Sequence, residues 1–182
     1  QSVAGGSQYE NVLDIAVSNV NNSLAYDEII VGTSNPAYVK LLNNTGNLIW
    51  SYAMTTAVYA VSVGNLSSDE GEEIVAGDSS KIVCLNSSGN EKWVKTIGNN
   101  VYDLEIKDLR EDFEYDEVAV AAGQKIYLLN SSGSELWSSS FPDICEGVGI
   151  GNLSSDQGEE IVGACGSFIH VLNSTGNVVW SK

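Results

Sequence analysis

Basic residues, histidine, cysteine, proline and long apolar runs are all scarce in this chain of 182 residues. Eight Lys and Arg face 24 Asp and Glu, which gives a formal net charge of -16. Because nucleic acids are bound by clustered Lys and Arg, this deficit excludes nucleic acid as an expected partner. No run approaches the ~18 apolar residues of a membrane-spanning helix, so no transmembrane segment is expected.

The start of the chain also lacks features. The sequence opens at Gln1 without an initiator Met, and no charged-then-apolar leader follows. This is expected of a mature, processed protein or of an expressed segment. Residues 1–10 are polar and contain glycine, and we expect them to form an N-terminal arm.

A nine-residue segment that occurs four times organises the rest of the chain. Each copy has apolar residues, then Asn, Ser or Thr, then Gly, then apolar residues and a Trp. This order is typical of a β-hairpin, whose tight turn needs the positive φ that Gly tolerates. The four tryptophans are separated by 43, 44 and 43 residues, which indicates a repeat architecture. The copies are Leu42–Trp50, Leu85–Trp93, Leu129–Trp137 and Leu172–Trp180.

Each repeat predicts four short strands and no helix. The first strands are Val12–Val17, Val58–Val63, Val101–Ile106 and Cys145–Ile150. A β-branched second strand begins at Glu28, Glu73, Glu117 and Glu160, and a third strand precedes each turn. The fourth strand carries the Trp. Four strands per ~43 residues match one blade of a β-propeller, so we expect an all-β fold with four four-stranded blades at about 11–53, 54–97, 98–141 and 142–182.

Two resemblances to known families follow from these residues. The Leu-Asn-x-Ser/Thr-Gly-x-x-x-Trp segments resemble the tryptophan-docking repeats of quinoprotein-type propellers, which include outer-membrane assembly lipoproteins that bind no cofactor. The loops Gly64–Val75 and Gly151–Val162 resemble FG-GAP or integrin-like repeats. Each Trp is then expected to lie across the neighbouring blade. The expected docking residues are Gly46, Trp50, Gly89, Trp93, Gly133, Trp137, Gly176 and Trp180.

Ring closure stays open at this stage. Four blades could close alone, pair with a second copy into eight, or stack in an assembly. No N-terminal strand is left over to complete the last blade unless the arm before Glu10 supplies it.

The FG-GAP resemblance implies Ca²⁺ sites in two loops, because Ca²⁺ takes oxygen ligands from carboxylates, amides and carbonyls. The matching positions are Asn65, Ser67, Asp69, Gly71 and Glu73, and then Asn152, Ser154, Asp156, Gly158 and Glu160. Asn and Ser replace the first two carboxylates, which predicts weak binding. The alternative is a tight loop whose Asp and Glu accept backbone N–H groups. The other two loops are longer, and Arg110 stands at a ligand position of the third.

Seven Asn-x-Ser/Thr sequons predict glycosylation, and all fall on expected loops. Asn and Ser are also favoured in turns for backbone reasons, so repetition alone could copy the pattern. A glycan on Asn65 or Asn152 would compete with a metal ion for the same side chain. The sequons begin at Asn21, Asn43, Asn65, Asn86, Asn130, Asn152 and Asn173.

Three cysteines are too few for a disulfide scaffold. Superposed repeats place Cys145 at the start of one strand and Cys165 just past the end of the next. In an antiparallel pair these ends lie side by side, so they could form a disulfide or be two small buried side chains. Cys84 would stay unpaired on a core strand.

Catalysis finds little support. His170 aligns with Lys40, Val83 and Tyr127 of the other repeats, which indicates a surface strand residue rather than a base. No nucleophile elbow, His/Cys metal spacing or phosphate-binding glycine loop is present. The acidic run could mimic a glycosidase pair, but a loop charge run is usually solvated. Its members are Glu111, Asp112, Glu114, Asp116 and Glu117.

The leading functional hypothesis is therefore a non-catalytic extracellular or cell-surface module for adhesion or assembly, with protein partners or copies of itself, as in a surface layer or filament. One alternative is a Ca²⁺-dependent binder of glycans or proteins that uses an exposed aromatic such as Tyr59 or Tyr102. A quinoprotein-type dehydrogenase is a third, although half the usual ring and no adjacent cysteine pair count against it. No cofactor is expected beyond Ca²⁺.

Overall fold

The computed structural model describes residues 10–22, 25–109, 114–154 and 158–182. These residues form sixteen strands in four antiparallel sheets of four strands, each in sequential order. The expected all-β fold of four four-stranded blades is confirmed. Most of the expected N-terminal arm lies outside the described residues; Glu10 is described and forms an ion pair with Lys40.

The first blade comprises β1 (Asn11–Ser18), β2 (Glu28–Ser34), β3 (Tyr38–Leu42) and β4 (Leu48–Ala53). The second comprises β5 (Ala60–Gly64), β6 (Glu73–Gly77), β7 (Lys81–Leu85) and β8 (Glu91–Thr96). The third comprises β9 (Val101–Lys107), β10 (Glu117–Ala122), β11 (Lys125–Leu129) and β12 (Glu135–Ser140). The fourth comprises β13 (Cys145–Gly151), β14 (Glu160–Cys165), β15 (Phe168–Leu172) and β16 (Val178–Ser181).

One expected strand start is wrong. The strand expected from Val58 begins at Ala60, because the N–H of Val58 donates to the carbonyl of Thr33 in the first blade at 3.1 Å. This bond ties the linker between the blades to the preceding blade instead of to its own sheet.

The hydrophobic core consists of three layers, one between each pair of neighbouring blades. Strand alternation sends successive side chains to opposite layers. On β6, Ile74 packs toward the first blade and Val75 toward the third. On β10, Val118 packs toward the second blade and Ala119 toward the fourth. The second strand of each interior blade is therefore buried on both faces.

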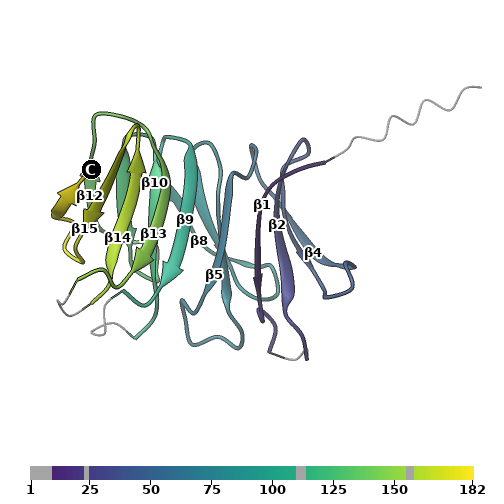
Figure 1. Cartoon of the computed structure of the whole chain (residues 1–182). Coiled ribbons are helices and arrows are strands. Elements are labelled where there is room, and N and C mark those ends of the chain that lie inside the picture. The colour runs from purple at the N-terminus through teal and green to yellow at the C-terminus, as the bar shows by residue number, and fades with distance from the viewer. Residues whose placement is uncertain (1–9, 23–24, 110–113, 155–157) are drawn as a thin grey trace, which may run out of the picture.

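The blades stand in a row that does not close within the chain. The inner strands β1, β5, β9 and β13 contact one another in that order. Figure 1 shows the first blade, around β1 and β2, at one end of the row and the last blade, around β15, at the other. Each terminal blade therefore has one face that no other blade of the described chain covers.

Among the described residues, no helix is long and apolar enough to cross a membrane.

Candidate functional site

Three of the four tryptophans join neighbouring blades in the same way. Each indole Nε1 donates to a backbone carbonyl in the turn of the next blade. Trp50 bonds the carbonyl of Ser87 at 3.0 Å, Trp93 that of Ser131 at 2.9 Å, and Trp137 that of Ser174 at 2.9 Å. Each joint therefore combines burial of an aromatic ring with one directed hydrogen bond.

Glycine in the receiving turn makes room for the ring. A Cβ at Gly89 would lie 2.8 Å from the indole of Trp50, and the same atom at Gly133 or Gly176 would lie 2.7 Å from Trp93 or Trp137. These three glycines also have φ between 78° and 81°, which L side chains rarely adopt. Backbone conformation and ring contact both require glycine here.

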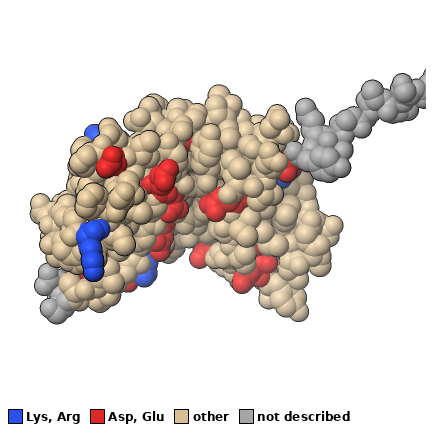
Figure 2. All heavy atoms as spheres, turned by 45° about the horizontal axis from the view of Figure 1, so that its top comes forward, with Lys and Arg blue, Asp and Glu red and all other residues tan. Residues whose placement is uncertain are grey.

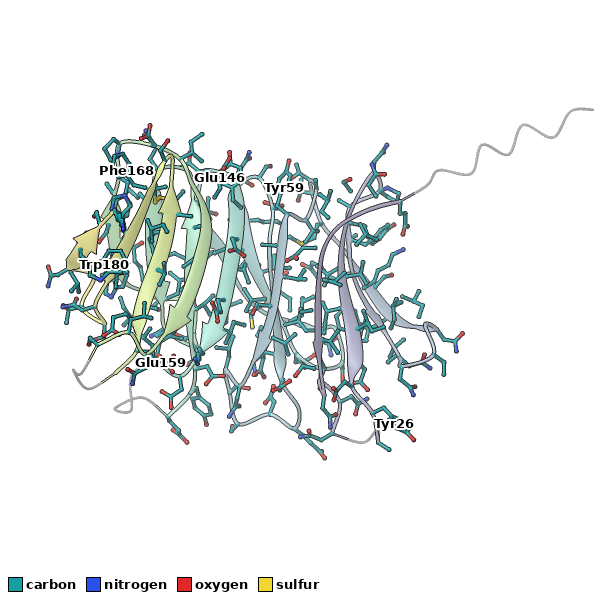
Figure 3. All side chains as sticks on the ribbon, in the orientation of Figure 1. Tyr26, Tyr59, Glu146, Glu159, Phe168 and Trp180 are labelled. Carbon is teal, nitrogen blue, oxygen red and sulfur yellow. A yellow bond between two sulfur atoms is a disulfide. The ribbon has the colours of Figure 1, made fainter. Side chains whose placement is uncertain are left out.

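The fourth Trp and the first turn depart from this pattern, contrary to the expectation that every Trp lies across a neighbouring blade. Trp180 on β16 is 47% exposed. A Cβ on Gly46, whose φ is 80°, would meet nothing within 4 Å. Both differ for the same reason, because no blade of the described chain packs on the outward side of Trp180 or of Gly46. Figure 3 shows Trp180 and Phe168 on the last blade, at the end of the row.

Apolar side chains surround each of these unmatched groups. We call Ile15, Val17 and the Gly46 turn the open N-terminal face, and Ile169 and Trp180 the open C-terminal face. Ile15 is 59% exposed and Val17 is 60% exposed. Ala16 between them packs into the first core layer, so alternation places Ile15 and Val17 on the opposite, outward side. Ile169 is 48% exposed and belongs to the outward side of β15.

The loop with the first expected Ca²⁺ site holds a lysine ammonium among its oxygens. Lys92 Nζ lies 2.7 Å from Ser67 Oγ, 2.5 Å from Asp69 Oδ2 and 3.4 Å from Glu73 Oε1. Asn65 is exposed and its N–H donates to Asp116. Gly71 has φ of 94°, and a Cβ on it would lie 2.3 Å from the carbonyl of Val20. The Lys92 ammonium thus supplies the positive charge that faces these carboxylates. A Ca²⁺ ion in this loop stays a prediction.

The fourth loop differs at the position of the lysine. Val179 follows the turn where Lys92 follows the equivalent one, so no ammonium enters this loop from that position. Glu160 accepts from the N–H of Leu153 at 2.6 Å and from Ser154 Oγ at 2.7 Å. Asn152 is exposed, Gly158 has φ of 110°, and Asp156 lies outside the described residues. In the described part of the chain no group of three or more His, Cys, Asp or Glu could hold a metal ion.

A buried glutamate begins the second strand of every blade. For Glu73 and Glu160 this confirms the alternative stated for the candidate metal loops, in which Glu accepts a backbone N–H; that all four blades share the device was not recognised from sequence. Each glutamate accepts a backbone N–H from the loop before it: Glu28 from Asn21, Glu73 from Leu66, Glu117 from Leu109 and Glu160 from Leu153. Desolvation raises the pKa of Glu160, but these hydrogen bonds outweigh it and hold the pKa below its usual value. The repeated Glu before a β-branched run was the available signal.

Carboxylates on the inner strands connect neighbouring blades, and sequence reasoning missed them. Asp14 accepts from the N–H of Val61 at 2.8 Å. Asp103 accepts from Val148 at 2.9 Å, and Glu105 from Ile150 at 2.8 Å. Burial raises the pKa of both Asp103 and Glu105, although these hydrogen bonds oppose the shift. Figure 2 shows acidic side chains gathered in the hollowed middle of the molecule, where few basic ones lie.

The acidic run of the third loop contributes to structure at its described end. Asp116 accepts from the N–H of Asn65 at 2.8 Å, which links the third loop to the second, and burial raises its pKa. Glu117 is the buried glutamate of the third blade, and Glu114 is exposed. Arg110, Glu111 and Asp112 lie outside the described residues.

None of the sequon asparagines is buried. Asn65 and Asn152 are exposed, and the others are partly exposed. In the four hairpin turns the Asn Oδ1 accepts backbone N–H groups, as Asn43 does from Thr45 at 3.0 Å and from Asn47 at 2.9 Å. Asn86, Asn130 and Asn173 repeat these contacts. The turns therefore use these asparagines structurally, and glycosylation stays a prediction.

Cys145 and Cys165 are Cα partners on β13 and β14 and form a disulfide. Cys84 is free and fully buried in the layer between the second and third blades, and its burial raises the thiol pKa to about 12.

His170 bonds Ser181 Oγ through Nδ1 at 2.7 Å, and its ring centroid lies 4.3 Å from that of Phe141. His170 is partly exposed, and the expectation that it is a surface strand residue rather than a base stays a prediction.

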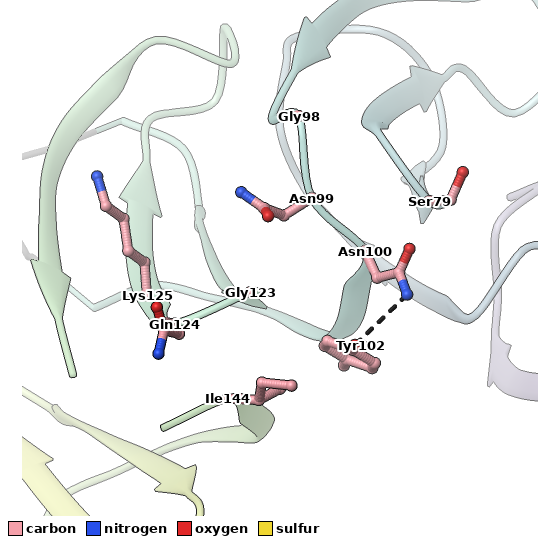
Figure 4. A pocket seen from close by; sticks show the side chains of 9 residues that line it. All are labelled: Ser79, Gly98, Asn99, Asn100, Tyr102, Gly123, Gln124, Lys125 and Ile144. Carbon is pink, nitrogen blue, oxygen red and sulfur yellow. Dashed lines mark hydrogen bonds between the residues drawn. The ribbon is translucent and has the colours of Figure 1, made fainter. Parts of the chain in front are cut away.

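A polar cavity of about 500 Å³ lies where the second, third and fourth blades meet, at the start of β9. Asn99, Asn100 and Gln124 line it with side-chain amides, and Tyr102 and Lys125 complete its wall. Asn100 Nδ2 donates to Tyr102 Oη at 3.4 Å (Figure 4). Tyr59, the other aromatic expected to contact a ligand, is 36% exposed and does not line this cavity.

The fold resembles that of several solved propeller structures. BBS1N, crystallised in complex with ARL6DN, has a TM-score of 0.72 and 16% identity, over 96% of this chain and 56% of that chain. BamB from Moraxella catarrhalis has a TM-score of 0.60 and 19% identity, over 96% and 52%. Sqt1 from Saccharomyces cerevisiae has a TM-score of 0.68 and 13% identity, over 86% and 43%. This chain thus spans about half the length of these structures.

These likenesses support a β-propeller and do not single out FG-GAP repeats. No family model matches the sequence, and no curated protein matches it.

Proposed function

We propose that this chain is a non-catalytic assembly module that acts outside the cell by joining protein surfaces through its blade faces. The observation that carries this proposal is the pair of open faces. Side chains whose equivalents are covered by a neighbouring blade at the internal joints are about half exposed at the ends of the row. Exposed apolar surface of this kind marks protein interaction sites in soluble proteins.

The similar structures agree with a role in protein binding. BBS1N is crystallised in complex with ARL6DN, and another similar chain, with a TM-score of 0.69, belongs to an active polycomb repressive complex 2. A propeller fold alone does not determine function, so the open faces carry the argument.

An extracellular location is supported by chemistry. Disulfides persist in oxidising compartments, and this chain has one between Cys145 and Cys165. Seven sequons with no buried asparagine offer acceptors for N-glycans. An intact mass of protein purified from its natural source tests this part. We expect added hexose-containing masses and the loss of two hydrogens for the disulfide; an unmodified, fully reduced mass would overturn the location.

Cross-linking of the protein in its native source tests the assembly role. Lys40 stands on the first blade and Lys182 directly follows β16 on the last. We expect amine cross-links from these two lysines to other polypeptides, whereas Lys81 and Lys125 of the interior blades should link mainly within the chain. Cross-links confined to single chains would contradict an assembly role.

The cavity at Tyr102 favours a second candidate, a glycan-binding function. Side-chain amides beside an aromatic ring suit the hydroxyl groups and the apolar face of a sugar. The cavity lies at the start of β9, whereas the loops with the expected Ca²⁺ ligands follow the ends of the inner strands. Figure 3 shows that these are opposite edges of the blades. Tyr59 and Glu146 lie at the edge where the inner strands start, and Tyr26 and Glu159 lie at the edge of the loops that follow these strands.

Binding in the cavity should therefore be independent of Ca²⁺. Calorimetry with oligosaccharides, in Ca²⁺ and in chelator, tests this candidate. Equal heats in both buffers that vanish in Tyr102→Ala would support it, and absence of heat from every oligosaccharide would count against it. A quinoprotein-type activity is suggested by the tryptophan repeats alone, and we do not favour it. We therefore expect no quinone absorbance after reconstitution with the cofactor.

A further inference from the structure

The four blades contain four docking tryptophans and four turn glycines but make only three joints between them. Trp50, Trp93 and Trp137 each contact the turn of the following blade. Within the described residues, Trp180 and the turn at Gly46, at opposite ends of the row, are left without a counterpart. A single chain thus carries both halves of a fourth joint and cannot bring them together.

We propose that Trp180 of one copy docks on the Gly46 turn of a second copy, and that two copies joined twice in this head-to-tail manner complete a ring of eight blades. This inference rests on the assembly role proposed above and names its partner.

The internal joints supply the geometry of the proposed contact. In each of them the indole Nε1 donates to the carbonyl two residues before the turn glycine, at 2.9 to 3.0 Å. Asn44 occupies this position in the first turn and is exposed. The Gly46 turn has the same backbone form as the others, with φ of 80°. The first turn therefore has the space and the acceptor position that Trp180 needs.

The side chains around the joint support the same pairing. Ile169 is 48% exposed, whereas Val39, Ile82 and Ile126 at the same position of the other blades are fully buried. Ile15 is 59% exposed, whereas its equivalents Val61 and Leu104 are each 5% exposed and its third equivalent, Val148, is partly buried. The register of each strand with its neighbour fixes these equivalences. Contact between the two open faces would bury the positions that internal joints bury.

A second copy fits the open faces better than an unrelated surface, because it carries both complementary halves. In a head-to-tail pair, each copy places its Trp180 on the Gly46 turn of the other copy. The pair therefore makes two joints and leaves no face open, as closed heterologous assembly requires. The length is consistent with a ring, since one chain matches 52% of BamB and 56% of BBS1N. Pairing two C-terminal faces would instead place Trp180 against Trp180 and leave both Gly46 turns empty.

Sedimentation equilibrium of the purified chain over a range of concentrations tests the proposal. We expect a dimer of twice the 19.4 kDa chain mass. Trp180→Ala should weaken the dimer about 30-fold or more, which is the effect of removing a tryptophan hot spot. Val179→Ala is the matched control: Val179 is 52% exposed and adjacent in sequence, but strand alternation turns it away from the side that Trp180 occupies.

A variant of the other half gives the second arm. Gly46→Asn keeps the turn, because Asn tolerates positive φ and the space around Gly46 is open. Its side chain should occupy the volume that the incoming indole needs, so this variant should also form a weaker dimer than the wild type. Circular dichroism and the urea midpoint of each variant, measured at concentrations where the wild type is monomeric, show that the blades are intact.

Mixing the two variants tests the direction of the contact. Trp180→Ala retains a functional Gly46 turn, and Gly46→Asn retains a functional Trp180, so a one-to-one mixture can form one intact joint. We expect more dimer in the mixture than in either variant alone at the same total concentration. A mixture that stays monomeric while the wild type dimerises would overturn the head-to-tail pairing, as would a Gly46→Asn variant that dimerises normally.

The outcomes separate this inference from the broader assembly role. A wild-type chain that stays monomeric at every concentration overturns self-association. If native cross-links from Lys40 and Lys182 then lead to a different protein or to further blades, the assembly role stands, and that protein or those blades cover the open faces. If the native cross-links also stay within one chain, both proposals fail.

Discussion

Trp137 lies against the turn at Gly176, where its Nε1 donates to the carbonyl of Ser174 at 2.9 Å and a Cβ on the glycine would lie 2.7 Å from the ring. Two more joints repeat this relationship along the row. Four-stranded sheets of this length cannot bury both faces alone, so such contacts decide how the chain holds together. We therefore expect substitutions to cost more free energy of unfolding where a joint is made than where a joint is missing.

Two glycines of nearly identical backbone conformation test this statement. Gly176→Ala and Gly46→Ala both place a Cβ at φ near 80°, which costs about 1 to 2 kcal/mol in either turn. Only at Gly176 does the Cβ also collide with an indole, which adds about 1 to 3 kcal/mol of overpacking. Urea unfolding of the monomer should show a clearly lower free energy of unfolding for Gly176→Ala. Equal losses would indicate that the ring contact contributes nothing.

Much of the fold could be predicted from the sequence, because the repeat is explicit in it. The spacing of Trp50, Trp93, Trp137 and Trp180 fixes the number of blades, and turn glycines fix the hairpins. What could not be predicted was the state of the ends. Trp180 stands in the same Leu-Asn-x-Ser/Thr-Gly-x-x-x-Trp pattern as Trp137, and only the three-dimensional order of the blades shows that no turn of the described chain lies against it.

The candidate metal loops show why local patterns were a weaker guide to the site. The spacing of Asp69 and Glu73 resembles that of Ca²⁺ ligands, but Lys92 reaches the same oxygens from a strand about twenty residues away in sequence. The inner-strand carboxylates were missed for a related reason. Asp103 and Glu105 alternate like solvent-facing residues, and their partners Val148 and Ile150 belong to the next blade.

Glu105 makes stability depend on pH. Burial raises the pKa of its carboxyl in the folded state, so the folded chain binds a proton more readily than the unfolded chain does. The free energy of unfolding contributed by this group therefore rises as pH falls from neutral through the raised pKa. Glu105→Gln lacks this gain but keeps an oxygen that can accept from Ile150.

We therefore expect Glu105→Gln to match or exceed the wild type in urea at neutral pH. Its advantage should shrink as the pH falls through the raised pKa of Glu105. Urea midpoints at three pH values across this range measure the effect. Parallel pH profiles for the two proteins would contradict a raised pKa at Glu105.

Lys92 should replace a bound cation in the second loop. Lys92→Met removes the charge that faces Asp69 and the buried Glu73, and we expect a loss of about 1 to 3 kcal/mol in the free energy of unfolding. Millimolar Ca²⁺ should restore part of that loss in the variant, because its oxygens then lack a counter-ion. Thermal melting with Ca²⁺ and with chelator measures this recovery.

Lys95→Met is the control for this experiment. Lys95 lies on the same strand and faces Glu135 at 3.7 Å near the surface, where an ion pair contributes about 0 to 1 kcal/mol. Its melting temperature should not respond to Ca²⁺. If Ca²⁺ raised the melting temperature of the wild type more than that of Lys92→Met, the lysine would not take the place of a metal ion.

The cysteines make a prediction that needs no substitution. The thiol of Cys84 is fully buried between two blades and its pKa is raised to about 12, so thiol reagents should not label the native protein. Denaturation without reductant should expose one reactive thiol, and denaturation with reductant should expose three, because Cys145 and Cys165 are bridged. Three thiols without reductant would show that the bridge is absent, and labelling of the native protein would show that the second and third blades separate.

Reduction of the bridge should also lower stability in a defined place. The disulfide closes a loop between residues 20 apart, and freeing such a loop costs about 3 kcal/mol in the chain-entropy account. Since both cysteines pack in the layer between the third and fourth blades, hydrogen exchange should accelerate first on β13 and β14. Uniform acceleration over all four blades would instead indicate that the row unfolds as one cooperative unit, because the remaining tryptophan joints then transmit the loss along its whole length.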